Sequence, residues 1–292
     1  MGKTILVTGA AGKLGMQISL YFASENNNLI LVDKDLVLLN FIKEKILKSF
    51  SNITVETFEV DFQSTNDLMT FTNAILKNFT AVDVIINNAS ITGDSNLSGF
   101  SGELSKEFQT TETFNEVFIV GVTAPFVIIR ELHPLLLNNI NSSIINISSI
   151  YGMVALTKSI YQEFKMPPAA YAAAKGALIS MTKYFATTLA PKIRVNCVAP
   201  GGILRSQPDE FIKKLNGNYI PLEDGGLRIE WFNVRPFSEK EMRLHIEVGH
   251  TPYIYIECLD KILRSNFHRL FHAPNTPLTP EVFLYCVRWF RE

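Results

Sequence analysis

Short apolar runs alternate with longer amphipathic stretches through the first two thirds of the chain, and this alternation constrains the fold most strongly. The six strand-like runs are residues 4–8, 28–33, 53–60, 82–87, 143–148 and 193–198; the helical stretches are residues 13–23, 35–50, 65–78, about 106–137 and about 169–189. Apolar strands that are each followed by a helix are typical of parallel sheets buried on both faces. The pattern predicts a three-layer α/β fold, with a doubly wound, mostly parallel sheet flanked by helices.

Composition and charge exclude several classes of protein. The 292 residues are 47% hydrophobic and 19% charged, and the formal net charge is -1. This balance argues against a nucleic-acid binder that works by bulk charge, and no run approaches the roughly 20 apolar residues of a membrane span. Cys197, Cys258 and Cys286 are odd in number and lack metal-ligand spacing, which favours a reducing compartment. We therefore expect a cytoplasmic protein without nucleic-acid or membrane partners.

A glycine-rich turn lies between the first strand and the first helix. Gly9 permits a tight turn, Gly12 lets the backbone approach a pyrophosphate, and Gly15 allows close packing of the helix. The helix N-terminus adds free N–H groups and the positive end of a dipole. The turn therefore predicts a dinucleotide site, and its residues are Thr8-Gly9-Ala10-Ala11-Gly12-Lys13-Leu14-Gly15.

Asp33 ends the second strand, about twenty residues after the glycine turn. A carboxylate at this place can accept hydrogen bonds from the ribose hydroxyls and repel a 2′-phosphate, which favours NAD over NADP. Lys13 and Lys34 lie close by in the sequence, and either could meet a phosphate. NAD is the expected cofactor, with NADP as the alternative.

Further motifs follow in order at the predicted strand ends. They are Asp61, Asn87-Asn88-Ala89-Ser90, Ser148-Ser149, Tyr171-x-x-x-Lys175 and Pro200-Gly201-Gly202. Together with the glycine turn, they resemble the short-chain dehydrogenase/reductase family over residues 3 to about 222. Within that family, the SSIYG sequence, the long insertion before YAAAK and the PGGI sequence are most similar to members associated with bacterial flagellin and surface-glycan sugar modification. The resemblance implies a Rossmann fold and an NAD(P)-dependent oxidoreductase acting on CH–OH groups.

Tyr171 and Lys175 carry the predicted chemistry. They are four residues apart on a predicted helix, which places both side chains on one face. A phenol with an ordinary pKa of about 10 is a poor acid or base at neutral pH, and an adjacent ammonium group lowers that pKa. Tyr171 is therefore the predicted acid/base for the substrate hydroxyl during hydride transfer. Ser149, at the end of the fifth strand, is expected to bind the substrate oxygen.

The resemblance also assigns the rest of the cofactor site. It implies that Lys175 holds the nicotinamide ribose and that Asp61 meets the adenine. Asn87 and Ala89 would line the cofactor strand, and the nicotinamide would pass the residues Pro200, Gly201 and Ile203.

Two departures from the family pattern bear on activity: Gly121, and residues 227–292, which do not match the usual C-terminal end of the family. A further feature, the long segment before Tyr171, bears on the substrate. Gly121 stands where many members carry an active-site Asn, so it has no side chain to hold a water in a proton relay. The segment between Ser149 and Tyr171 runs 22 positions, which builds either a binding loop for a sugar or nucleotide or a surface excursion. We predict hydride transfer on a secondary alcohol or ketone, with a sugar derivative as the favoured substrate. The alternative is a catalytically quiet dinucleotide-binding sensor or partner subunit.

The composition of the chain changes near residue 224. Residues 1–224 hold 15 Lys and 3 Arg, whereas residues 225–292 hold 2 Lys and 7 Arg. We predict a dinucleotide-binding and catalytic domain over residues 1–224, and an atypical C-terminal segment, residues 225–292, that completes the sheet or docks on it. His268 and His272 have helical spacing but no third ligand nearby, so no metal site is expected. The helices from about residues 106 and 169 are expected to pair subunits into a homodimer or homotetramer.

Overall fold

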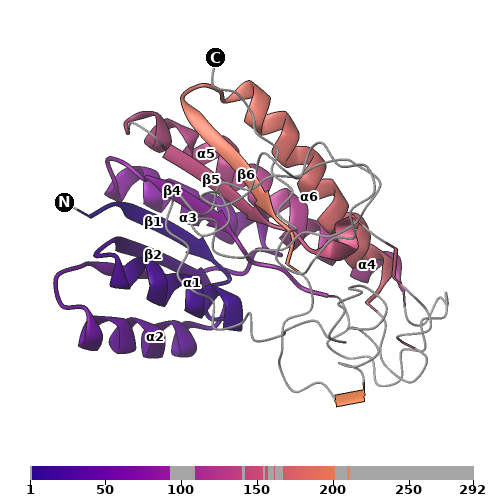
Figure 1. Ribbon diagram of the computed structural model, residues 1–292, viewed down its shortest axis with the longest axis horizontal. Helices are drawn as coiled ribbons and strands as arrows, with labels where there is room; N and C mark the ends of the chain where they lie inside the picture. The colour runs from indigo at the N-terminus through magenta and orange to yellow at the C-terminus, as the bar shows by residue number, and fades with distance from the viewer. Residues whose placement is uncertain are drawn as a thin grey trace, which may run out of the picture.

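A six-stranded parallel sheet forms the centre of the molecule (Figure 1). The computed structural model describes residues 2–92, 109–139, 142–153, 155–156, 161, 167–200 and 209–210. The strands are β1 (Thr4–Thr8), β2 (Asn28–Asp33), β3 (Val55–Glu59), β4 (Val84–Asn87), β5 (Ser142–Ile147) and β6 (Ile193–Val198), in the spatial order β3-β2-β1-β4-β5-β6. The order reverses between β1 and β4, and ligands of such sheets bind at the carboxyl ends of the strands at this point.

Helices cover both faces of the sheet, so the predicted three-layer α/β fold is confirmed. One face packs against α1 (Lys13–Ser24) and α2 (Leu36–Ser49), and the other against α3 (Thr65–Asn78), α5 (Ala124–Leu137) and α6 (Ala169–Thr188). Successive strand residues point to opposite faces. In β1, accordingly, Ile5 and Val7 belong to the core under α1 and α2, whereas Leu6 belongs to the other core. The central strands β1 and β4 are largely apolar because both of their faces are buried, whereas the edge strand β3 carries Glu56 and Glu59, which are exposed.

Side-chain caps mark the starts of three of the six described α-helices. Asp35 accepts a hydrogen bond from the Leu38 N–H before α2, Ser64 accepts from Asp67 before α3, and Thr110 accepts from Thr113 before α4 (Thr111–Phe118). The last cap corrects the sequence prediction, which began this helix near residue 106. A cap residue has extended backbone geometry, so the helix begins after Thr110.

A continuous helical stretch runs through α4, a π-helical turn η1 (Ile119–Thr123) and α5. Among the residues that the structure describes, this 27-residue stretch, Thr111–Leu137, is long and apolar enough to cross a membrane by length and composition alone. The expectation that no run comes near that threshold was therefore wrong. The stretch is apolar because it supplies a core layer: Ile128, Leu132 and Leu136 are fully buried against the sheet.

The residues beyond 210 lie outside the described part of the chain. The predicted C-terminal segment, residues 225–292, therefore stays a prediction, as do the environments of Cys258, Cys286, His268 and His272.

Candidate active site

The glycine turn sits at the reversal point of the sheet, against the end of β4. Gly9 has a φ of 64°, in the left-handed region that favours glycine, and a Cβ there would lie 2.8 Å from the Ala89 Cα. A Cβ on Gly15 would lie 2.1 Å from the Gly9 carbonyl oxygen. The tight turn and the close packing of α1 that the glycine spacing predicted are both present.

Hydrogen bonds of Thr8 and Asn88 connect this turn to the end of β4. Neither residue was assigned an individual role from the sequence. The Thr8 hydroxyl oxygen accepts from the N–H groups of Asn88 and Ala89, both at 3.0 Å. The Asn88 side-chain amide donates to the carbonyl oxygens of Thr8 at 2.9 Å and Gly9 at 3.0 Å. The sequence did contain a signal for this contact. Asn88 directly follows a predicted strand, and the carboxyl end of a parallel strand lies beside the carboxyl ends of its neighbours, where the side chain of Asn88 can donate to the backbone.

The N-terminus of α1 is the one start among α1 to α4 that has no side-chain cap. Gly12 occupies the cap position, is exposed, and has no side chain to accept from the first-turn N–H groups. Lys13 is exposed beside it. The first N–H groups of a helix need an acceptor, and a phosphate is a suitable one. The residues present therefore fit the pyrophosphate of a dinucleotide.

Asp33 contacts the glycine turn directly. One carboxylate oxygen accepts from the Ala11 N–H at 3.0 Å, and the other accepts from the Asp35 N–H at 3.3 Å. Asp33 is half-buried at the end of β2, and Lys34 beside it is exposed. The Asp33 carboxylate thus binds the backbone of the glycine turn, a contact that is separate from the predicted hydrogen bonds to the ribose. Asp61 lies exposed beyond the end of β3, and its side chain accepts from Gln63.

Tyr171 and Lys175 lie together on the first two turns of α6, as their spacing predicted. The Lys175 Nζ is 5.7 Å from the centre of the Tyr171 ring. Lys175 is only 3% exposed, and its ammonium group donates to the Ile147 carbonyl oxygen of β5 at 2.8 Å. Lys175 therefore connects α6 to the end of β5, where Ser149 follows.

Burial controls the electrostatics of this pair. It lowers the pKa of Lys175 from 10.5 to about 8, and the neighbouring Cys197 acts in the opposite direction. Burial also raises the pKa of the Cys197 thiol from 9.0 to about 11, so the thiol is uncharged at neutral pH. Lys175 is consequently a cation at neutral pH whose proton is held less tightly than that of an exposed lysine.

The turn that carries Ser149 packs against the helix that carries Lys175. Ser149 is buried, and its hydroxyl oxygen accepts from the Tyr151 N–H at 3.3 Å in the 3-10 turn η2 (Ile150–Gly152). A Cβ on Gly152 would lie 2.6 Å from the Lys175 carbonyl carbon. The Ser148 hydroxyl also donates to the Lys175 carbonyl oxygen, at 2.7 Å. Sequence reasoning gave Ser148 and Gly152 no individual role, although the glycine of SSIYG was visible.

The ends of β5 and β6 are joined beside this turn. The Ser148 N–H donates to the Val198 carbonyl oxygen at 2.6 Å, and the Ile150 N–H donates to the Pro200 carbonyl oxygen at 3.0 Å. Pro200 therefore lies next to the Ser149 turn. Gly201 and Ile203 lie outside the described residues.

Gly121 is buried in η1 and faces α6. A Cβ there would lie 3.5 Å from the Ala174 Cβ, an ordinary contact distance next to Lys175. π-Helical turns within α-helices are frequent at functional sites. Gly121, the position where the resemblance put an Asn, therefore faces the residue of α6 that precedes Lys175.

Tyr161, in the long segment before α6, contacts the turn that follows Ser149. Tyr161 is buried, its hydroxyl is hydrogen-bonded to the Tyr151 hydroxyl, and the two rings meet edge to face with centres 6.4 Å apart. Residues 154, 157–160 and 162–166 lie outside the described part. Within the described residues, His, Cys, Asp and Glu form no group of three or more that could hold a metal.

Comparisons with known proteins agree with this geometry. The short chain dehydrogenase family matches residues 3–214. The 3-oxoacyl-(acyl-carrier-protein) reductase FabG of Staphylococcus epidermidis (strain ATCC 35984) is 30% identical over 263 residues, which are 87% of this chain and 98% of the reductase. That share of the chain extends beyond residue 224.

Solved structures share the fold. A short-chain dehydrogenase of Escherichia coli CFT073 complexed with NADPH is 26% identical, with a TM-score of 0.57 over 69% of this chain and 77% of that one. NAD+-bound xylitol dehydrogenase is 24% identical, with a TM-score of 0.58 over 74% of this chain and 75% of that one.

Proposed function

Because the chain belongs to the short-chain dehydrogenase/reductase family and is an NAD(P)-dependent oxidoreductase acting on CH–OH groups, we propose that Tyr171 is its acid/base. The supporting observation is the convergence of Tyr171, Lys175 and the Ser149 turn between β5 and α6. The bound nicotinamide supplies or accepts the hydride. The substrate is a secondary alcohol or ketone.

The three side chains have distinct parts in the proposed mechanism. The Ser149 hydroxyl donates to the substrate oxygen and orients it toward Tyr171. In ketone reduction, the Tyr171 hydroxyl gives its proton to the oxygen of the new alcohol; in oxidation, the phenolate removes it. The Lys175 cation beside the ring favours the phenolate, since opposite charges attract strongly in a buried site.

We propose NAD as the preferred cofactor. The support is Asp33, whose carboxylate at the end of β2 is half-buried next to the glycine turn and would repel a 2′-phosphate. Lys13 and Lys34 at the same edge favour a phosphate, which is why NADP remains the alternative. The two structural neighbours were solved with NADPH and with NAD+.

A sugar derivative of the kind used in flagellin or surface-glycan modification is the proposed substrate. The pair of half-buried Tyr151 and buried Tyr161 supports it, because tyrosine rings and hydroxyls together suit a ligand with apolar faces and many hydroxyls. The second candidate function, a cytoplasmic dinucleotide sensor, is favoured by Gly121, which leaves the site without one side chain of the usual relay.

The test is turnover by Tyr171→Phe against wild type, with NADH oxidation followed on keto sugars and on 3-oxoacyl thioesters. Loss of the phenol should lower kcat by about 10²- to 10⁴-fold, the usual contribution of a general acid/base, while the Kd for NADH changes by less than about twofold. Tyr184→Phe is the matched control, because Tyr184 is on the same helix and 65% exposed. Turnover retained by Tyr171→Phe would exclude the acid/base role, and NADH binding without wild-type turnover would favour the sensor.

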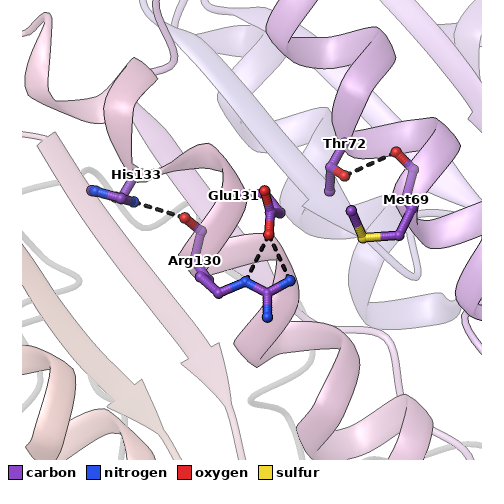
Figure 2. A network of polar contacts seen from close by, with 5 residues as sticks. All are labelled: Met69, Thr72, Arg130, Glu131 and His133. Carbon is purple, nitrogen blue, oxygen red and sulfur yellow. Dashed lines mark hydrogen bonds and ion pairs between the residues drawn. The ribbon is translucent and has the colours of Figure 1, made fainter.

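We also propose that two copies pair through α5 and α6. Phe126 and Tyr184 are 40% and 65% exposed, and both rings contact Phe185 between them. On the same face Arg130 lies over Phe126, at 5.5 Å from the ring centre, and pairs with Glu131 (Figure 2). Aromatic residues and arginine are enriched in the centres of protein interfaces. A second copy of this chain is therefore the proposed occupant of this face.

A further inference from the structure

A row of polar side chains crosses the buried sheet directly behind the candidate site. Asn87, Asn146 and Cys197 are register partners on β4, β5 and β6, and each is at most 1% exposed. They follow Ile85, Ile144 and Val195 by two residues, so they point to the same face of the sheet, toward α6. Polar groups buried among aliphatic side chains are costly unless they are hydrogen-bonded.

The Thr182 hydroxyl determines which groups donate and which accept in the hydrogen bonds of this row. A hydroxyl has one proton, and Thr182 donates it to the Leu178 carbonyl oxygen at 2.8 Å. Its oxygen therefore accepts from the Asn146 Nδ2 at 2.9 Å, which turns the Asn146 Oδ1 toward the Asn87 Nδ2 at 2.8 Å. A single directed chain of hydrogen bonds thus ties α6 to β5 and β4.

The tie lies next to the bond that holds Lys175. Thr182 follows Lys175 by seven residues, about two helical turns, so both side chains face the sheet. Lys175 donates to the Ile147 carbonyl oxygen, and Thr182 accepts from Asn146, the preceding residue of β5. Asn146 and Ile147, adjacent residues of β5, therefore bind α6 at two positions about two helical turns apart. If α6 slid or turned against β5, both bonds would be strained together.

We propose that Thr182 is a positioning residue for the reaction. By accepting from Asn146, its hydroxyl sets the placement of α6 against β5, which in turn places Lys175 and Tyr171 for proton transfer. This inference rests on the proposed roles of Tyr171 and Lys175, and Thr182 itself touches neither substrate nor cofactor.

The chain offers a matched set of variants. Thr182→Val keeps the shape of the side chain but removes the acceptor for Asn146, whereas Thr182→Ser keeps the hydroxyl. Thr72→Val is the control, because Thr72 is also fully buried and its hydroxyl donates within its own helix α3, to the Met69 carbonyl oxygen at 3.1 Å (Figure 2). The control therefore removes a buried local hydrogen bond without altering the tie between α6 and β5.

Two measurements test the proposal. In turnover, Thr182→Val should lower kcat by about tenfold with KM nearly unchanged, since misplacement costs orientation rather than binding, and Thr182→Ser should restore most of the rate. The second measurement needs no substrate: the ultraviolet titration of the Tyr171 phenolate, obtained by subtracting the same protein with Tyr171→Phe. Its midpoint should move to higher pH in Thr182→Val and stay in place in Thr182→Ser and Thr72→Val.

The outcomes separate the positioning role from the proposed function. If Thr182→Val matches Thr72→Val in both the phenolate titration and kcat, the positioning role is wrong. If wild type turns over none of the substrates, the proposed activity fails, and the phenolate titration still decides whether Thr182 places Tyr171.

Discussion

At the scale of single residues, Gly152 brings the Ser149 turn into close contact with the backbone of α6. The turn that bears Ser149 can press against α6 only because residue 152 has no side chain, since a Cβ would come within 2.6 Å of the Lys175 carbonyl carbon and 2.8 Å of the Gly176 nitrogen. Backbone atoms at such distances cannot yield as a flexible side chain would. The distance between Ser149 and the catalytic pair therefore depends on this glycine.

Gly152→Ala should consequently impair turnover. The turn must move away from α6, and a shift of about 1 Å at a reacting centre can cost about 10²-fold in rate; the overpacking should also lower the free energy of unfolding by about 1–3 kcal/mol. Steady-state kinetics and urea denaturation measure the two effects. Gly176→Ala on the other side of the contact is the control, because its Cβ would meet the Gly152 oxygen at an ordinary 3.4 Å. Equal activity in both variants would contradict the argument.

The protonation state of Lys175 affects the free energy of unfolding as well as the proposed activity. Burial lowers the pKa of Lys175 from 10.5 to about 8, so between pH 8 and 10.5 the unfolded chain binds more protons than the folded chain. The free energy of unfolding then rises with pH in this window, and the folded protein bears the cost of a buried cation at neutral pH.

Lys175→Met should be more stable than wild type at pH 7 and nearly inactive. The stability of wild type relative to this variant should rise by about 3 kcal/mol from pH 7 to 10.5, as measured by urea denaturation at each pH. Cys197 titrates in the opposite sense, because its raised pKa of about 11 makes stability fall from pH 9 to 11. Because the Lys175 cation also lowers the pKa of Cys197, both proteins are compared with Cys197→Ala in place, which removes this contribution. A constant difference across the window would show that Lys175 does not titrate as a buried group.

At the scale of elements, the strand-turn-helix unit β1-α1 depends on β2. Asp33 at the end of β2 accepts from the Ala11 N–H in the glycine turn, so one carboxylate both supports the turn and faces the expected ribose. An alanine at this position would remove both functions at once. Asparagine separates them, since its oxygen still accepts from Ala11 while its charge is lost.

Asp33→Asn should therefore narrow the preference for NADH over NADPH. Without the negative charge, the 2′-phosphate is no longer repelled, and the ratio of the two Kd values should fall by about tenfold, about 1.4 kcal/mol. Fluorescence titration of each cofactor measures the ratio, and thermal melts check that the turn remains intact. If the ratio is the same as in wild type, Asp33 has only the structural role.

At the scale of the whole molecule, the proposed pairing through α5 and α6 has a simple consequence. Tyr184→Glu places a charge at the centre of this face and should reduce the assembly measured by light scattering to a smaller species, because an unpaired charge buried in an interface is strongly unfavourable. Phe41→Glu is the control: Phe41 is 57% exposed, on α2 on the opposite side of the sheet. Loss of assembly in both variants, or in neither, would contradict a pairing face on α5 and α6.

Periodicity and local sterics explain how much of the fold was predictable. Strand and helix periods are properties of residues a few positions apart, so β1, β2, β6 and α3 have the predicted bounds, and the others differ by up to two residues except at the start of α4. The glycine turn was equally accessible, because Gly9 is required by its own positive φ. A four-residue spacing on a helix likewise placed Tyr171 beside Lys175.

The sequence by itself therefore determined the elements, the parallel sheet and the residue types of the site. Only the tertiary structure decided that Gly152 meets Lys175, that Asn88 holds the turn of Gly9, and that Asn146 joins Thr182. These partners are 23 to 79 positions apart in the chain, so their contact depends on the order of the strands and on the depth at which α6 packs. No local pattern encodes that depth, because it results from the shape of every side chain packed between the sheet and the helix.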